Sequence, residues 1–415
     1  MWGFSDMIIK IATKDLVPGM KVVDLDLPGL ADPFLYAKEG VLRTRKEVDQ
    51  VLVEGYLDAY IDTAASESGD LEEEIEESIP PQEQAVPYKN RLPPQVALEK
   101  ELPAARTLFD HSVHFARDAL TGLCQGNELP LEAGNAIVDA IFNSITRNYN
   151  ALLGLVKLRR RDEYTYTHCI NVCVLSLLLS AQLGNDEATT KKVGLAGLFH
   201  DIGKVFIPEE ILNKNGPLTS EEFMVMKKHP ELGCQYVKRY NLPDEIVSGI
   251  RDHHEKLNGK GYPRGLMGSE ISETARLISI ADIYDALTSR RVYKDPMLPH
   301  QALCLMYSMC GDELDERLFT AFIRSQGIYP VGSVVELSSG WRGVVLQINP
   351  NKPLCPQVAL IRSPLGHFRM GEVVDLSAQS QVKITKVMTP VEAGVDPALV
   401  FPGCNTPPIQ QYVSS

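Results

Sequence analysis

The spacing of apolar residues along the chain changes character twice. Between residues 8 and 63, short apolar runs such as 8–12 and 22–25 are separated by turn residues, a pattern typical of strands. Residues 41–60 add a predicted helix, a break at Gly55 and a final strand. From residue 96 apolar positions recur every three or four residues, which predicts helices, and from residue 331 strand-like runs return. We therefore expect a mostly α protein with an all-helical core, a small N-terminal α/β unit and a small C-terminal β unit.

These changes divide the chain into five segments. Serine, glutamate and proline dominate residues 64–95. Such a composition buries too little apolar area to offset the entropy of ordering, so we interpret this segment as a linker, with an acidic inhibitory segment as the alternative. The expected order is an N-terminal regulatory domain at 1–63, the acidic, proline-rich linker at 64–95, a helical domain at 96–330, a small β domain at 331–395 and a tail at 396–415.

The charge of the chain is concentrated in one place. The formal net charge is −13, which disfavours nucleic acids and anionic membranes as partners. Eight of the acids lie in the linker, without a Lys or Arg among them: Glu67, Asp70, Glu72, Glu73, Glu74, Glu76, Glu77 and Glu83. The folded parts are therefore closer to neutral, and a local basic pocket remains compatible with them. No apolar run reaches the roughly 18 residues of a membrane span, and no signal peptide is evident.

The pattern of cysteines indicates the redox environment of the protein. The eight cysteines form no CxxC pair, which argues against a structural zinc site or a disulfide framework. A reducing cytoplasm fits this pattern.

Histidines and aspartates carry the candidate chemistry. His200-Asp201 follows the apolar residues 193–199, so we expect a buried helix to deliver both side chains into a pocket. Asp282 lies in a uniformly apolar run, where a carboxylate is costly unless it is paired or binds a metal. Imidazole and carboxylate without thiolate favour Fe, Mn, Ni or Zn over Mg or Ca, and two such ions suit in-line displacement at phosphorus. The candidate cluster comprises His168, His200, Asp201, His229, His253, His254 and Asp282.

Two further segments are candidates for substrate contacts. Residues 259–265 hold three glycines and a proline, so they predict a sharply turned loop that either lies on the surface or forms one wall of the metal pocket. Tyr262 could stack on a base or hydrogen-bond a phosphate. Arg291 and Lys294 are three apart and share a helix face, which is typical of solvated surface but would also suit a phosphate clamp.

Taken together, these motifs resemble a known family. The sequence His200-Asp201-Ile202-Gly203-Lys204, followed in order by His253-His254-Glu255 and Gly259-Lys260-Gly261-Tyr262-Pro263, resembles the HD-GYP domain over about residues 140–330. That domain is a branch of the HD metal-dependent phosphohydrolases. The N-terminal segment is similar to a domain of unknown function that often precedes HD-GYP domains in bacteria. The resemblance implies an all-helical catalytic domain with two or three metals, usually iron, that hydrolyses cyclic di-GMP to linear pGpG or GMP by metal-hydroxide attack at phosphorus.

The resemblance also implies a role for each candidate residue. Asp201 would bridge two metals, and Lys204 would lie over the attacking hydroxide and the scissile phosphate. Asp285 is similar to a family acid that supports the ligands without binding the metal. The implied metal ligands are His168, His200, Asp201, His229, His253, His254 and Asp282, and the implied substrate contacts are Tyr262, Gly261, Pro263, Arg291 and Lys294.

One departure from the family pattern bears on the number of metals. Three-metal members carry a glutamate one helical turn before the first histidine ligand, and Tyr164 stands at that position here. The adjacent Glu163 would point about 100° away around a helix. We therefore predict two metals rather than three.

Three functions stay open at this point. They are a cyclic di-GMP phosphodiesterase, a phosphodiesterase for another cyclic dinucleotide, and a slow or inactive cyclic di-GMP sensor. The sensor would signal to partner proteins through the loop at 261–263, the N-terminal unit or the β unit. The oligomeric state is not indicated by any pattern.

Overall fold

The computed structural model describes residues 8–12, 16, 20–26, 40–41, 58–62, 94–157, 164–214, 216, 218–289, 297–349, 351–379 and 381–401. The chain divides into two compact units, each treated by itself below. One unit comprises Met1–Gln84 with Gln301–Met309, and the other comprises Ala85–His300 with Cys310–Ser415. Within the described residues, no helix combines the length and the apolarity needed to cross a membrane.

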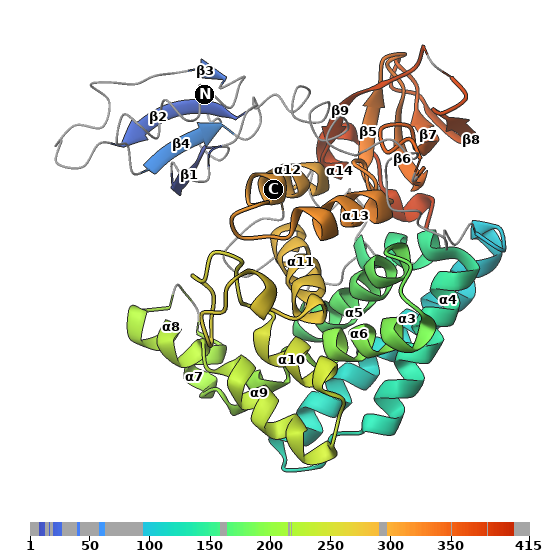
Figure 1. The fold of residues 1–415 in the computed structure, drawn as a ribbon. Coiled ribbons are helices and arrows are strands. Elements are labelled where there is room, and N and C mark those ends of the chain that lie inside the picture. Colours follow the sequence, from blue (N-terminus) through green and yellow to red (C-terminus); the bar gives the residue numbers. More distant parts are fainter. Residues whose placement is uncertain are drawn as a thin grey trace. The chain divides into compact units, whose positions relative to one another are not determined.

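Four short strands make up the described part of the N-terminal unit. They form one antiparallel sheet in the order β1-β4-β2-β3 (Figure 1), with the bounds Ile8–Ala12 for β1, Lys21–Asp26 for β2, Gly40–Val41 for β3 and Asp58–Asp62 for β4. The strands predicted at 8–12, at 22–25 and around residue 60 are confirmed. The helix predicted between residues 41 and 55 and most of the predicted linker lie outside the described residues.

The predicted helical core is confirmed. Two long helices begin it, as expected for residues 96–160, and shorter helices follow (Figure 1). The helices are α3 (Leu98–Cys124), α4 (Leu131–Lys157), α5 (Tyr164–Gln182), α6 (Glu187–Phe199), α7 (Glu209–Leu212), α8 (Ser220–Met226), α9 (His229–Val237), α10 (Asp244–Asp252), α11 (Glu273–Thr288) and α13 (Glu316–Gln326), with a 3₁₀ helix, η3, at Ile202–Phe206. Helix α12 covers Pro299–Ser308.

Helix α5 forms the centre of this core. Every residue from 167 to 181 is buried, so the helix has no polar stripe and must be covered on all sides. Helices α3, α4, α6, α11 and α13 all pack against it. Asp186 precedes the neighbouring α6, and its side chain caps the helix by accepting a hydrogen bond from the backbone N–H of Thr189 at 2.7 Å. This arrangement directs the C-terminal end of α6 toward the middle of α5.

The predicted C-terminal β unit is also confirmed. Its five antiparallel strands follow the order β8-β7-β6-β5-β9, with the bounds Val334–Leu337 for β5, Arg342–Gln347 for β6, Gln357–Arg362 for β7, Phe368–Asp375 for β8 and Ile384–Met388 for β9. A short helix, α14, covers Pro390–Ala393, and a 3₁₀ turn, η6, covers Pro397–Leu399.

The C-terminal segment is joined to helix α4 by two contacts. The side chain of Asn150 accepts a hydrogen bond from the backbone N–H of Ile348 at 3.3 Å. The ring of Phe401 is fully buried, and a Cβ placed on Gly154 would come within 2.5 Å of it. The chain is therefore packed as far as Phe401, inside the segment that we expected to be a tail. Residues 402–415 lie outside the described part.

Candidate metal centre

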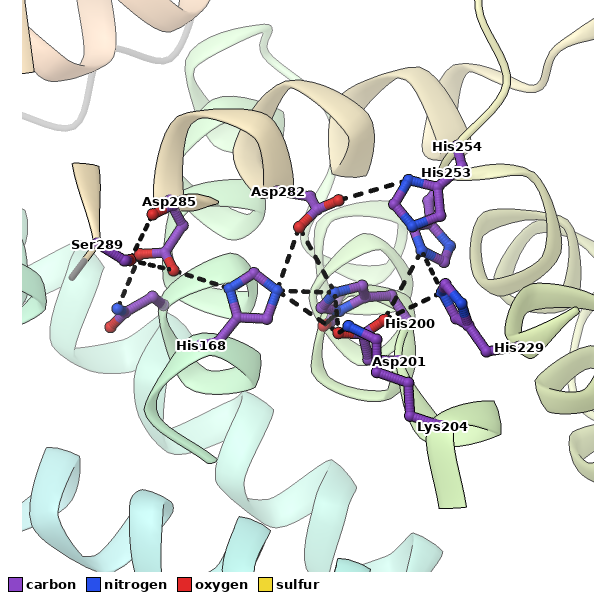
Figure 2. A network of polar contacts seen from close by, with 12 residues as sticks. His168, His200, Asp201, Lys204, His229, His253, His254, Asp282, Asp285 and Ser289 are labelled. Carbon is purple, nitrogen blue, oxygen red and sulfur yellow. Dashed lines mark hydrogen bonds and ion pairs between the residues drawn. The ribbon is translucent and has the colours of Figure 1, made fainter. Parts of the chain in front are cut away.

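The ends of several helices bring the seven predicted ligands together (Figure 2). His168 lies on α5, and Asp282 lies on α11. The other residues stand at helix boundaries: His200 and Asp201 directly after α6, His229 at the start of α9, and His253 and His254 directly after α10. They form two adjoining groups, each with ligand atoms within 4.8 Å of one another. The Asp201 group is Asp201, His229, His253 and His254, and the His168 group is His168, His200 and Asp282.

The carboxylate of Asp201 lies between the two groups. Its Oδ1 atom is 3.2 Å from Nε2 of His229 and 4.0 Å from Nε2 of His253. Its Oδ2 atom is 3.4 Å from Nε2 of His200 and 3.6 Å from Nε2 of His168. Oδ1 is buried, and no donor among the described residues reaches it in hydrogen-bond geometry. A buried carboxylate oxygen is costly without a partner, so this atom fits a bound cation.

Backbone carbonyls orient three of the histidines. Nδ1 of His200, His229 and His253 lies 2.7 to 2.8 Å from the carbonyl oxygen three residues earlier in the chain. Because a carbonyl can only accept, Nδ1 carries the proton and donates it. Nε2 of each ring then keeps its lone pair and faces the cluster, as in protein sites where histidine binds a metal.

His168 is oriented by a carboxylate instead. Its Nδ1 atom lies 2.8 Å from Oδ2 of Asp285, which is fully buried on α11. Asp285 also accepts hydrogen bonds from Nδ2 of Asn171 at 2.9 Å and from Oγ of Ser289 at 3.0 Å. Figure 2 shows this chain of contacts at the left, on the side of His168 away from the other ligands. Asp285 thus lies beside a proposed ligand rather than among the ligands, in line with the role that the resemblance implies.

The electrostatics of the cluster favour a cation. Burial alone would raise the pKa of Asp201, but the charge of Lys204 and the nearby imidazole of His200 hold that pKa well below its usual range. Burial likewise opposes ionisation of Asp282, but its hydrogen bond with His168 lowers the pKa well below the ordinary value. Burial lowers the pKa of His254 to about 3 and also lowers that of His253. Two charged carboxylates thus lie near two imidazoles, His253 and His254, that burial keeps neutral. Carboxylate and neutral imidazole form a donor set suited to divalent transition metals.

His168 behaves differently from those imidazoles. Burial works to lower its pKa, but hydrogen bonds with Asp282 and Asp285 outweigh burial and raise the pKa to about 9. In the absence of a cation, a proton on His168 therefore balances part of the carboxylate charge. A bound metal would replace that proton.

Lys204 stands at the accessible side of the cluster. Its Nζ atom lies 2.5 Å from Oδ2 of Asp201, and its side chain is 30% exposed. Desolvation would lower the pKa of this ammonium group, but the Asp201 carboxylate outweighs that effect and raises it. Lys204 is therefore a fixed positive charge beside the carboxylate that joins the two groups.

Gly203 permits a close approach between two parts of the cluster. A Cβ at this position would lie only 1.8 Å from the carbonyl oxygen of His229. The backbone after Asp201 therefore touches the backbone that carries His229, and any side chain at position 203 would push the two apart. This contact explains why glycine follows the His200-Asp201 pair.

The loop with Gly261 and Tyr262 lies against the Asp201 group. The ring of Tyr262 is 4.7 Å from the ring of His254, with an interplanar angle of 32°. The backbone N–H of Tyr262 donates to the carbonyl of His254 at 3.1 Å. A Cβ on Gly261 would lie 2.4 Å from Cα of Glu255, so this approach also requires glycine. Tyr262 and the adjacent Pro263 are half-buried, and burial raises the pKa of the tyrosine.

Two acids that hold this loop were missed by the sequence reasoning. The buried carboxylate of Glu255 accepts hydrogen bonds from the backbone N–H groups of Arg264 at 2.6 Å, Gly265 at 3.1 Å and Leu266 at 2.9 Å. Buried Asp252 pairs with the guanidinium of Arg264 at 2.6 Å. The available signal was an acidic residue on each side of the histidine pair, just before a glycine-rich turn.

Some predicted residues lie outside the described part of the chain. Arg291 and Lys294 belong to this set, as do the side chains of Glu163 and Tyr164 on which the prediction of two metals rests.

Comparison with known proteins identifies the class of this chain. A family model described as an HD domain matches residues 150–318. A model for a domain of unknown function, DUF3391, matches residues 8–133, and a model for a KOW domain associated with the HD domain matches residues 334–394. Fold and site therefore define a hydrolase with an HD domain.

Relatives narrow the class further. A cyclic di-GMP phosphodiesterase of Pseudomonas aeruginosa is 35% identical over 393 residues, which cover 93% of each chain. A 3′3′-cGAMP-specific phosphodiesterase of Vibrio cholerae is 34% identical over 184 residues, or 44% of this chain and 42% of that protein. A solved HD-GYP-type protein from Bdellovibrio bacteriovorus aligns with 76% of this chain and 98% of its own, at 21% identity and a TM-score of 0.45. The relative from Pseudomonas aeruginosa, similar over nearly its whole length, shows that the chain belongs to the family of HD-domain cyclic di-GMP phosphodiesterases.

Proposed function

We propose that this protein is a metal-dependent phosphodiesterase that hydrolyses cyclic di-GMP to linear pGpG, to GMP, or to both. The observation that carries the proposal is the position of Asp201, whose two carboxylate oxygens face two separate groups of histidines. The relative from Pseudomonas aeruginosa, similar over nearly the whole chain, supports cyclic di-GMP as the substrate.

We propose that the seven clustered residues hold two divalent transition-metal ions. Iron is our first choice, and Mn, Ni and Zn suit the same nitrogen and oxygen donors. Tyr164, at the position where three-metal members carry glutamate, argues against a third ion. When bound, the ions would supply Lewis acidity and an activated water at neutral pH.

The chain's own residues would position the substrate and stabilise charge. Lys204, a positive charge beside Asp201, would stabilise the negative charge that develops on the phosphate oxygens. Tyr262 would contact a base, with the backbone of Gly261 and Pro263 beside it, and Arg291 and Lys294 would bind phosphate. Asp285 would keep the ring of His168 in its orientation.

Anaerobic purification, metal quantification and a chromatographic assay with cyclic di-GMP test this proposal. We expect two metals per chain and a linear product. The His200→Ala variant should lose metal and turnover while it stays folded. The His111→Ala variant is a matched control, because His111 is an exposed histidine of α3 outside both groups. Full activity of His200→Ala would contradict the assignment of the site.

The same experiment tests two alternatives to the proposed function. The similarity to a 3′3′-cGAMP-specific phosphodiesterase favours another cyclic dinucleotide as a second candidate substrate. Tight binding of cyclic di-GMP without product would indicate a sensor that acts through partner proteins at the loop of residues 261–263 or at the N-terminal unit. We also propose that the protein is located in the cytoplasm.

A further inference from the structure

A lysine beside the metal centre lies between two aromatic rings. The Nζ atom of Lys227 is 4.8 Å from the centroid of the Phe223 ring and 5.2 Å from the centroid of the Tyr262 ring. Phe223 lies on α8, and Lys227 caps that helix one turn later. The loop after α10, which carries Tyr262, runs close to the end of α8 (Figure 1). These three side chains form a group that we term the aromatic-lysine site.

The aromatic-lysine site adjoins the Asp201 group on two sides. Lys227 precedes His229 by two residues, and the Tyr262 ring contacts the imidazole of His254 in a tilted arrangement. Phe223 is 45% exposed, so its side chain is accessible to a ligand. A molecule bound at the metal centre would therefore meet this site.

Among the described residues, several cations of this region are paired with an acid, and Lys227 is not one of them. Lys214 pairs with Glu222 at 2.5 Å, Lys256 with Glu313 at 2.6 Å, and Arg264 with Asp252 at 2.6 Å. Of the carboxylates in the described ranges, none lies within ion-pair distance of Lys227, and its neighbours are the two rings. Its ammonium group therefore keeps hydrogen-bond donors available for a ligand.

The combination of an ammonium group and aromatic rings suits a purine base. Aromatic side chains stack on any base, but an ammonium group distinguishes between bases by their edges. Guanine presents two acceptors, O6 and N7, on one edge, whereas adenine presents an amino donor beside N7. A phosphate contact would need the ammonium group alone and would gain nothing from the two rings.

We propose that Lys227 binds the O6/N7 edge of a guanine that stacks at Phe223 and Tyr262, and that it thereby selects guanine over adenine in a cyclic dinucleotide. This inference rests on the proposed function, because it assigns base selection to the same substrate. It makes Lys227 a residue that determines specificity, separate from Lys204, to which the proposed function assigns the phosphate.

The Lys227→Met variant tests the proposal, because methionine keeps the length of the side chain and removes its charge and donors. The values of kcat/KM are measured with cyclic di-GMP, 3′3′-cGAMP and cyclic di-AMP. We expect the preference for cyclic di-GMP over cyclic di-AMP to fall about tenfold or more, with the mixed dinucleotide in between. Metal content should stay unchanged. Lys227→Arg, which keeps the donors, should retain the preference.

Lys228→Met provides the matched control. Lys228 is the next residue and is exposed, and no aromatic ring in the described part of the chain lies within cation–π distance of it, so this variant should keep the wild-type preference. An equal loss with all three substrates in Lys227→Met would overturn the proposal in favour of a phosphate contact. An unchanged preference would also overturn it and would leave Lys227 as a packing residue.

Binding measurements separate this inference from the proposed function. Dissociation constants of the same three nucleotides are measured by calorimetry for wild type, Lys227→Met and Lys228→Met. A wild-type protein that hydrolyses none of them would contradict the proposed function. The ratio of dissociation constants would still decide whether Lys227 selects guanine.

Discussion

The two groups of the metal centre hold their histidines in different ways. In the Asp201 group, the buried rings of His229 and His253 are oriented by backbone carbonyls at helix boundaries. In the His168 group, a carbonyl orients His200, but a carboxylate, Asp285, orients His168. Substitution cannot remove a backbone carbonyl, whereas a carboxylate is a single replaceable side chain. The orientation of the Asp201 group therefore depends on helix packing, and that of the His168 group also depends on one acid.

The two groups also differ in the pKa of their histidines, and the carboxylates beside His168 are again the cause. Burial lowers the pKa of His253, and the charge of Asp282 offsets only part of this effect, whereas hydrogen bonds with Asp282 and Asp285 raise the pKa of His168 to about 9. A carboxylate behind an imidazole also makes the ring a stronger donor to a metal. If each group holds one ion, as proposed, we expect the two ions to be bound with different strengths, and substitutions in each group can separate them.

Removing the residue that both groups share should have the largest effect. Asp201→Ala deletes the carboxylate between the groups, so we expect loss of metal from both and a fall in turnover of at least about 10³-fold. Metal quantification and the cyclic di-GMP assay measure this. A variant that keeps both ions would show that Asp201 does not join the groups.

Gly203→Ala should act on the Asp201 group. The added Cβ would collide with the carbonyl of His229, displace that ring and lower kcat by about 10²-fold. We expect metal content to fall from two ions per chain toward one. Wild-type metal content in a folded Gly203→Ala protein would argue that the backbone there can shift without cost.

Asp285→Ala should act on the His168 group. Without the carboxylate, the His168 ring loses its orientation, and we expect metal affinity in this group to fall about 30-fold. Titration with a chelator measures the affinity. Asp285→Asn keeps an acceptor but removes the charge, so its metal affinity should fall less. An equal fall in affinity in both variants would show that the charge of Asp285 matters and that its orienting role does not.

Glu255→Gln should spare both groups and affect only the loop. The amide of glutamine would face backbone N–H groups that need an acceptor, so the loop with Tyr262 should loosen. We expect KM to rise about tenfold with metal content and kcat nearly unchanged. Glu210→Gln, at an exposed acid of α7, is the control, and a loss of metal in Glu255→Gln would place the loop within the metal centre.

Phe401→Ala should have the smallest effect on activity. Removing this buried ring from its contact with Gly154 should lower the free energy of unfolding by about 3 kcal/mol, as measured by urea denaturation. Turnover under native conditions should stay at the wild-type level, because no proposed ligand touches Phe401. Val391→Ala, at an exposed apolar residue of α14, should change stability little.

Much of the fold could be predicted from local patterns. Apolar spacing of three and four residues predicted α3 and α4, and short β-branched runs predicted the strands of the C-terminal unit. These signals are local, because the period of apolar residues follows from the geometry of one helix or one strand. The packing of Phe401 against Gly154 had no such signal, because 247 residues separate the two positions in the sequence.

The sequence by itself determined which side chains the centre contains. Histidines next to apolar helices and an aspartate inside an apolar run cannot be buried without partners, so their presence predicted a shared polar site. Only the tertiary structure decided how those residues are divided and oriented. Which oxygen of Asp201 faces which histidine, which rings rest on carbonyls, and that Lys227 lies between Phe223 and Tyr262 all depend on contacts between separate elements. Such contacts follow from the packing of several helices against one another, and the local period of apolar residues does not predict them.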